Sequence, residues 1–171
     1  MDEREELVEQ LFATRYGEAV RLAWGLTGDA MLAQELAQEA FVRVYVHRKR
    51  LRDPAAAPAY LRRTVVNLVF SHSRRAARVR LSGQQMEVER GSGGIEKTED
   101  RVDVSAALAA LPDRRRACVV LRYYVDLTEA DTAAALGISI GTVKSQTHKA
   151  LAQLREQLGP FGMNLEEEER T

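Results

Sequence analysis

The sequence is poor in the residues that mark secreted, membrane-spanning or aromatic-rich proteins. Its single cysteine, Cys118, excludes an intramolecular disulfide and lies in an apolar run, so we expect a buried thiol in a reducing, cytoplasmic compartment. No apolar run approaches the roughly 20 residues that span a bilayer, and the acidic start, Met1 to Glu6, is the opposite of a signal peptide's basic start. Aromatic residues make up only 6% of the chain, and its many Ala, Leu, Arg and Glu residues favour helices over a sheet.

The sequence also lacks the residue patterns of catalytic and metal sites. The three histidines are scattered, with no second histidine or cysteine at ligand spacing beside any of them. The glycine-rich segment 91–94 lacks the Lys-Ser/Thr pair of a phosphate-binding loop. Glu35 and Glu39 would share one face of a helix, but nothing near them would perturb their acidity. We therefore expect no catalytic residue, no metal, no cofactor and no enzymatic activity, and we interpret this pair as a surface that faces a partner.

The formal net charge of zero hides a strong segregation of charge along the chain. Residues 1–42 carry nine acidic and three basic side chains, whereas residues 43–80 carry eleven Lys or Arg against Asp53 alone. A basic block of this density is typical of a surface that binds phosphates. The alternative interpretation is an ordinary solvated helical face.

Hydrophobic periodicity predicts an all-α protein of two small helical domains joined by a flexible linker. In the N-terminal half we expect helices over residues 5–26, 30–48 and 59–80, with a break at 27–29 and a connector that contains Pro54 and Pro58. In the C-terminal half we expect short helices over 102–111 and 112–124. The predicted units are a domain over 1–80, a glycine-rich linker over 81–100, a domain over 101–158 and an acidic, disordered tail over 159–171.

The segment from Leu127 to Leu158 predicts a helix-turn-helix. Thr128 can cap a short helix with Asp131 at its third position, and Gly137 sits where the chain must turn sharply. Ser139 can cap a longer helix, whose predicted apolar stripe comprises Ile140, Val143, Thr147, Leu151, Leu154 and Leu158.

The opposite stripe of that longer helix is polar and contains no carboxylate. Its residues are Thr142, Ser145, Gln146, Lys149 and Gln153. Donors and acceptors without negative charge are what a helix needs to read base edges beside phosphates in the major groove. The alternative interpretation is two amphipathic helices of an ordinary all-α domain.

Several of these segments together resemble a known family, the sigma-70 family of bacterial RNA polymerase sigma factors. Within it the resemblance is closest to the extracytoplasmic-function (ECF) group, which keeps only regions 2 and 4. Residues 33–44 resemble region 2.2, and residues 59–68, running on to Arg74 and Arg75, resemble regions 2.3 and 2.4. The segments that resemble region 4 are 111–116, 120–124, 127–131, 135–139 and 141–145.

The resemblance implies a role for each charged surface. The protein would bind core RNA polymerase, through the β′ clamp helices and the β flap, and promoter DNA, and many relatives are held by an anti-sigma factor. The residues that would bind the clamp helices are Gln34, Glu35, Gln38 and Glu39. At the −10 element the family captures a flipped base and helps to melt DNA. The residues that the resemblance implies there are Arg48, Arg52, Asp53, Tyr60, Arg62, Arg63, Asn67, Arg74 and Arg75. Those implied at the −35 element are Thr142, Lys144, Ser145, Gln146, His148, Lys149 and Arg155.

Two other classes of protein fit part of the pattern. A repressor or activator could use the same helix-turn-helix as a stand-alone regulator, but it would need neither the basic third helix nor its acidic neighbour. A helical adaptor that binds only proteins would have no use for the basic block. The sequence therefore favours an alternative sigma factor that binds core polymerase, recognises the −35 and −10 elements and promotes DNA melting.

Overall fold

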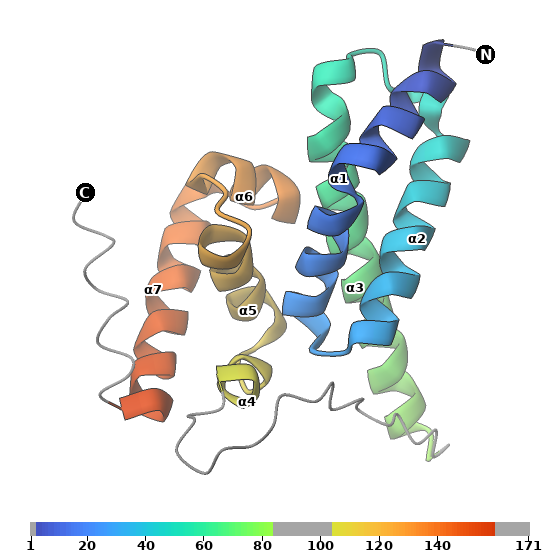
Figure 1. Ribbon diagram of the computed structural model, residues 1–171. Coiled ribbons are helices and arrows are strands. Elements are labelled where there is room, and N and C mark those ends of the chain that lie inside the picture. The colour runs from blue at the N-terminus through green and yellow to red at the C-terminus, as the bar shows by residue number, and fades with distance from the viewer. Residues whose placement is uncertain (1–2, 84–103, 160–171) are drawn as a thin grey trace.

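A computed structural model describes residues 3–83 and 104–159, and within these ranges the chain is helical and contains no strand. The predicted linker at 81–100 and the predicted tail at 159–171 fall almost wholly outside the described residues. The helices form two groups that lie side by side, as Figure 1 shows. The elements are α1 (Glu3–Thr27), α2 (Ala30–Val46), η1 (Arg48–Arg50), η2 (Pro54–Ala56), α3 (Ala57–Leu81), α4 (Val104–Ala109), α5 (Asp113–Val119), η3 (Val120–Tyr124), α6 (Glu129–Leu136) and α7 (Ile140–Leu158).

The first three long helices form the N-terminal group. Asp29 caps α2 through a 3.0 Å hydrogen bond from the Leu32 backbone N–H to its Oδ1, so the chain reverses within two residues of α1. The buried face of α2 is rich in alanine, which lets the helices approach closely. Its buried residues are Ala33, Leu36, Ala37, Ala40, Phe41 and Val44.

The connector between α2 and α3 is more regular than the sequence predicts. It forms two 3₁₀ turns, and Asp53 caps the second by accepting a 2.9 Å hydrogen bond from the Ala55 N–H. Helix α3 begins at Ala57, two residues before the predicted start, with Pro58 in its first turn. Proline is tolerated there because the first helical N–H groups have no intrahelical partner.

The C-terminal group contains the predicted helix-turn-helix with its predicted caps. The backbone N–H of Asp131 donates to Thr128 Oγ1 at 3.0 Å, and the N–H of Thr142 donates to Ser139 Oγ at 3.1 Å. Gly137 ends α6 in the left-handed conformation, at φ 66°, as a residue without a Cβ readily does. The helix predicted over 112–124 is an α-helix only as far as Val119, and Val120 to Tyr124 form a π-helical turn.

One predicted core position of α7 is wrong. Ile140 is 46% exposed, although the other five residues of the predicted stripe are buried. It is the first residue of the helix and lies one turn before Val143, where the packing of α7 begins. Ala150, which the prediction omitted, is buried instead.

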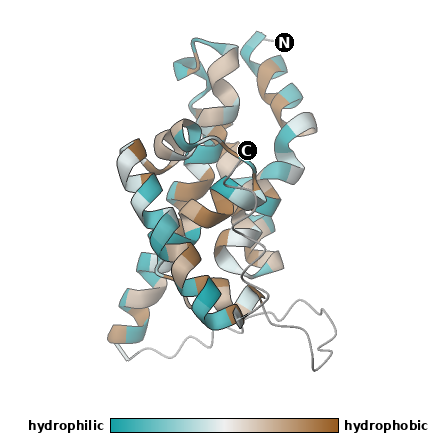
Figure 2. Ribbon diagram, turned by 90° about the vertical axis from the view of Figure 1, so that its left-hand side faces the viewer, coloured by the Kyte–Doolittle hydropathy of each residue, from teal (hydrophilic) through white to brown (hydrophobic). Residues whose placement is uncertain are grey.

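The two groups share an apolar core. Val120, Leu121 and Ala135 belong to the same buried cluster as Leu22 and Val66 of the N-terminal helices. Helix α6 packs on α3, and η3 packs on α1, so that α7 lies on the far side of the C-terminal group (Figure 1). Figure 2 views the molecule from that side and shows hydrophilic and hydrophobic residues alternating along the nearest helices. The structure contains the two predicted groups of helices, and this junction packs them against each other.

Candidate nucleic-acid and polymerase interfaces

The N-terminal turn of α7 is held in place by a short hydrogen-bond network. The hydroxyls of Ser139 and Thr142 lie 2.8 Å apart, and Ser145 Oγ donates to the Thr142 carbonyl at 3.2 Å. Lys144 Nζ lies 3.6 Å from Glu129 Oε2, which connects α7 to α6. Three of the residues predicted to contact DNA therefore also fix the geometry of the helix start.

The predicted DNA-binding residues of α7 differ in their exposure, and Lys144 and Ser145 are both exposed. His148 and Lys149 are exposed, and Gln146 and Arg155 are half-buried. Gln153, on the predicted polar stripe, accepts a 3.2 Å hydrogen bond from Arg115 of α5. The predicted residues that are exposed, Lys144, Ser145, His148 and Lys149, therefore lie in the N-terminal half of the helix.

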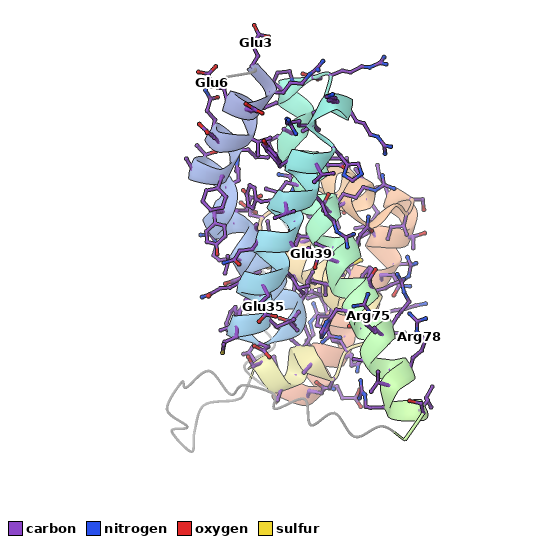
Figure 3. All side chains as sticks on the ribbon, turned by 90° about the vertical axis from the view of Figure 1, so that its right-hand side faces the viewer. Glu3, Glu6, Glu35, Glu39, Arg75 and Arg78 are labelled. Atoms are coloured by element: carbon purple, nitrogen blue, oxygen red, sulfur yellow. The ribbon has the colours of Figure 1, made fainter. Side chains whose placement is uncertain are left out.

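Helix α3 presents a row of cations to solvent. Arg63, Asn67, Arg74 and Arg75 are exposed, and Figure 3 shows Arg75 and Arg78 projecting from the same helix. The exposed set also includes Arg78 and Arg80, which were counted in the basic block but not among the predicted site residues. The sequence could have identified Arg78, because it lies four residues after Arg74 and residues at that spacing share a helix face.

Other residues predicted at the −10 element have partners within the protein. Arg62 Nη1 lies 3.4 Å from Glu18 Oε1 of α1, and both side chains are more than four-fifths buried, at 16% and 18% exposure. Tyr60 is half-buried against the N-terminal core, and Asp53 serves as the helix cap. Arg52 is exposed.

Arg48 also has an internal partner. Its Nη2 lies 3.2 Å from Glu5 Oε1, and its guanidinium carbon lies 4.1 Å from the centre of the Tyr45 ring. A guanidinium over an aromatic face is attracted by the ring's charge distribution. These contacts attach the connector to α1, and a role of Arg48 in DNA binding stays a prediction.

Helix α2 presents the predicted acidic face. Gln34, Glu35, Gln38 and Glu39 are all exposed, and Figure 3 shows Glu35 and Glu39 on α2, beside the arginines of α3. Glu39 Oε1 lies 2.6 Å from Arg43 Nη2 one turn later. Sequence reasoning missed the exposed apolar side chains on the same helix, which are Met31, Val42, Tyr45 and Val46.

The described residues were also compared with the requirements of a metal site, a membrane span and a reactive thiol. Within residues 3–83 and 104–159, no group of three or more His, Cys, Asp or Glu side chains lies where it could hold a metal ion. No helix in the same ranges is long and apolar enough to cross a membrane. Burial raises the pKa of the Cys118 thiol to about 11, although the positive charge of Arg114 opposes that shift. The buried, protonated thiol confirms the prediction of a small core residue.

Residues 3–83 and 104–159 form a helical protein with a helix-turn-helix, a cationic face on α3 and an acidic face on α2, and comparison with known proteins defines its family. Residues 11–79 match the family model for sigma-70 region 2, and residues 101–154 match that for sigma-70 region 4. The chain is 36% identical over 165 residues to an RNA polymerase sigma-E factor of Streptomyces antibioticus, covering 95% of this chain and 92% of that protein. It is 34% identical over 149 residues to the ECF RNA polymerase sigma factor SigL of Mycobacterium tuberculosis, covering 84% of each.

Two solved structures have a similar fold. The sigma factor RpoE of Bartonella quintana, in complex with the anti-sigma factor NepR, superimposes with a TM-score of 0.75 at 22% identity, over 89% of this chain and 96% of that one. CnrH, in complex with the cytosolic domain of CnrY, superimposes with a TM-score of 0.63 at 26% identity, over 88% and 86%. The chain belongs to the ECF group of the sigma-70 family of RNA polymerase sigma factors. It is an alternative sigma factor, which binds core RNA polymerase and promoter DNA in transcription initiation.

Proposed function

We propose that the three surfaces described above divide the work of initiation among α2, α3 and α7. The exposed acidic face of α2 binds core polymerase at the β′ clamp helices, the cationic face of α3 engages the −10 element, and α7 reads the −35 element. The observation that carries this division is the separation of charge between two neighbouring helices. Carboxylates on α2 would repel DNA, whereas the arginines of α3 attract it.

At the −35 element, α7 would enter the major groove with its N-terminal end. The groove admits an α-helix, and Gln146 and Lys149 carry hydrogen-bond donors that suit base edges. Lys144, His148 and Arg155 would lie nearer the phosphates. Because Ser139 and Thr142 fix the first turn, the helix presents these groups without ordering itself on binding.

At the −10 element, α3 would hold the displaced strand after the duplex opens. Arg63, Asn67, Arg74 and Arg75 supply exposed charge and hydrogen-bond donors along one helix, as binding of unpaired DNA requires. Arg78 and Arg80 extend this row. We assign Arg62 and Arg48 to positioning, since each forms an ion pair with a glutamate of α1.

Further inferences concern the partners and the compartment. We infer that the protein catalyses no reaction of its own and acts in the cytoplasm, where polymerase and promoters are found. The C-terminal helices would contact the β flap of polymerase. The similar structure of RpoE is bound to the anti-sigma factor NepR, and that of CnrH is bound to the cytosolic domain of CnrY, which supports a protein partner of the anti-sigma kind for this chain as well.

Reconstituted transcription with core polymerase tests the proposal. Promoter-specific transcripts from genomic fragments should appear when the chain is added to core polymerase, and they should be absent with either component alone. A chain that bound duplex DNA tightly by itself and left core polymerase inactive would instead be a stand-alone regulator.

A further inference from the structure

The first turn of α7 exposes an apolar side chain that packing within the protein does not explain. Ile140 is exposed, whereas Val143 and Thr147, on the turns that follow, are buried. Within residues 3–83 and 104–159, Ile140 belongs neither to the two buried apolar clusters nor to the partly buried residues packed against them. A single exposed isoleucine is common on protein surfaces, so its meaning depends on its position.

Ile140 lies at the edge of the exposed face of α7 that carries predicted DNA-binding residues. Lys144 follows it by one helical turn and His148 by two, and both are exposed. Lys144 marks which edge this is, because its Nζ lies 3.6 Å from Glu129 Oε2 of α6. The apolar side chain therefore begins a row that continues with two nitrogen-bearing side chains suited to DNA.

Gly141, the next residue, is a glycine that the described part of the chain does not require. It is exposed, and its φ lies outside the left-handed region that favours glycine. A Cβ at this position would lie 3.9 Å from Ser139 Oγ, which is an ordinary van der Waals contact. Alanine would fit there and would favour the helix. A glycine where alanine fits indicates the close approach of an external ligand to the backbone.

Gly141 lies at the centre of the exposed face. Lys144 and Ser145 lie on either side of it one turn later, and His148 lies almost directly behind it after two turns. Duplex DNA that docks on this face would therefore come closest to the backbone at Gly141. The same approach would bring the edges of the bases to Ile140, the neighbouring side chain.

The chemistry of the major groove restricts what Ile140 can select. The C5-methyl of thymine is the only methyl group that the four bases present there, beside nitrogen and oxygen donors and acceptors. An isoleucine packed against those polar edges would remove water from them without replacing its hydrogen bonds, which costs free energy. Thymine is therefore the base that an apolar side chain at this position favours.

We propose that Ile140 is a specificity-determining residue that selects a thymine of the −35 element by packing against its C5-methyl group. Gly141 lets the helix come close enough to the bases for this contact. The inference rests on the proposed role of α7 and extends it to a base that is selected without a hydrogen bond. Burial of one methyl group corresponds to about fourfold in affinity.

Removal of single methyl groups from the DNA tests the contact. In a promoter that the holoenzyme transcribes, each thymine of the −35 element on either strand is replaced in turn by deoxyuracil, which lacks only the methyl group. At one position this replacement should weaken binding of the wild-type holoenzyme about fourfold. The holoenzyme with Ile140→Ala should bind both DNAs equally. Val104→Ala, which shortens an exposed valine of α4, is the control and should stay as sensitive as the wild type.

A substitution at Gly141 tests the close approach separately from the fold. Gly141→Ala should leave the urea midpoint equal or higher, because alanine favours the helix, yet it should weaken promoter binding by the holoenzyme. Gly17→Ala is the matched control on α1, where a Cβ also has room, and should leave promoter binding unchanged. An unchanged promoter affinity of Gly141→Ala would contradict the close approach.

The possible outcomes separate this inference from the proposed function. Equal affinity for thymine and uracil at every position would overturn the inference, and the proposed function would stand if Lys149→Ala still weakened promoter binding. Weaker binding of Ile140→Ala to core polymerase would also overturn it, by assigning Ile140 to a protein contact. A wild-type holoenzyme whose binding did not depend on the −35 sequence would instead reject the proposed role of α7.

Discussion

Gly25 of α1 faces Val120 of η3 so closely that a Cβ at position 25 would lie 2.8 Å from Val120 Cγ1. The same carbon would lie 3.2 Å from Cδ1 of Tyr124, whose ring centre is 6.0 Å from that of Trp24. Gly25 lies in the last turn of α1, and the close approach of the two helix groups there leaves no room for a Cβ. The junction between the groups depends on this missing side chain.

Gly25→Val should loosen the junction. The added methyl groups have no room beside Val120, and overpacking of this kind costs about 1–3 kcal/mol. We expect an altered fluorescence of Trp24, the single tryptophan, and a larger radius of gyration by X-ray scattering. Gly17→Val is the matched control, since the nearest atom to a Cβ at that position is a flexible arginine end 4.0 Å away. Identical scattering from both variants would contradict the prediction.

Arg75→Ala and Arg62→Ala should separate DNA binding from positioning on α3. Arg75 is exposed, so its removal should lower the affinity of the holoenzyme for promoter DNA and reduce the salt dependence of binding, with little effect on stability. Arg62 pairs with Glu18 in a largely buried position, so its removal should lower the free energy of unfolding by about 1–3 kcal/mol. Filter binding at several salt concentrations and urea unfolding measure the two effects. A reversed pattern would refute this division of roles.

Lys149→Ala should weaken promoter binding about tenfold and leave core polymerase binding intact. Lys149 is exposed on the accessible face of α7. Gln157→Ala, at an exposed position near the end of the same helix, is the control and should leave promoter binding unchanged. Fluorescence anisotropy with labelled promoter fragments measures the first quantity, and competition for core polymerase measures the second. Equal losses in both measurements would show that this face is wrongly assigned.

Glu39→Lys should impair binding to core polymerase. It removes a carboxylate from the proposed contact and places a cation one turn from Arg43, which now forms an ion pair with Glu39. Like charges four residues apart cost an isolated helix only about 0.2–0.5 kcal/mol, so the fold should persist. Glu156→Lys, on the exposed surface of α7, is the matched reversal. An affinity for polymerase equal to that of the control would argue against the acidic face.

The thiol of Cys118 should make stability depend on alkaline pH. Its pKa in the folded protein is raised to about 11 from an ordinary value of 9.0. The folded state therefore keeps a proton that the unfolded state loses, and stability falls as the pH rises from 9 to 11. The wild type should lose about 2 kcal/mol more than Cys118→Ala across that interval, by urea unfolding. Parallel curves for the two proteins would show that the thiol does not titrate this way.

The features that sequence reasoning predicted best are the local ones. Thr128 and Ser139 cap their helices through hydrogen bonds to residues three positions away, so their partners are visible in the sequence itself. The positive φ at Gly137 follows equally from the turn it must make. The exposed polar face of α2 also follows from helical periodicity alone, because its opposite face is so rich in alanine and leucine.

The features that it missed depend on contacts between distant segments. Periodicity marks Ile140 as apolar but cannot show that the packing of α7 begins only at Val143. The basic block includes Arg62, and nothing near it in sequence reveals its partner Glu18, 44 residues away. Val42 and Tyr45 resemble ordinary helix residues until α1 is placed beside them. In each case the missing information is the position of another helix.

The junction has a consequence for how the protein meets its promoter. A Cβ on Gly137, in the turn before α7, would lie 3.6 Å from Nη2 of Arg63 on α3, so the two DNA-facing elements adjoin each other. The −10 and −35 promoter elements, which we propose that α3 and α7 bind, lie about 25 base pairs apart, or about 85 Å along B-form DNA at 3.4 Å per step. Occupation of both at once therefore requires the junction to part. The free energy needed to separate the two helix groups lowers the apparent affinity for the whole promoter. A substitution that strengthens the junction would therefore weaken promoter binding, even though the substituted residue does not contact DNA.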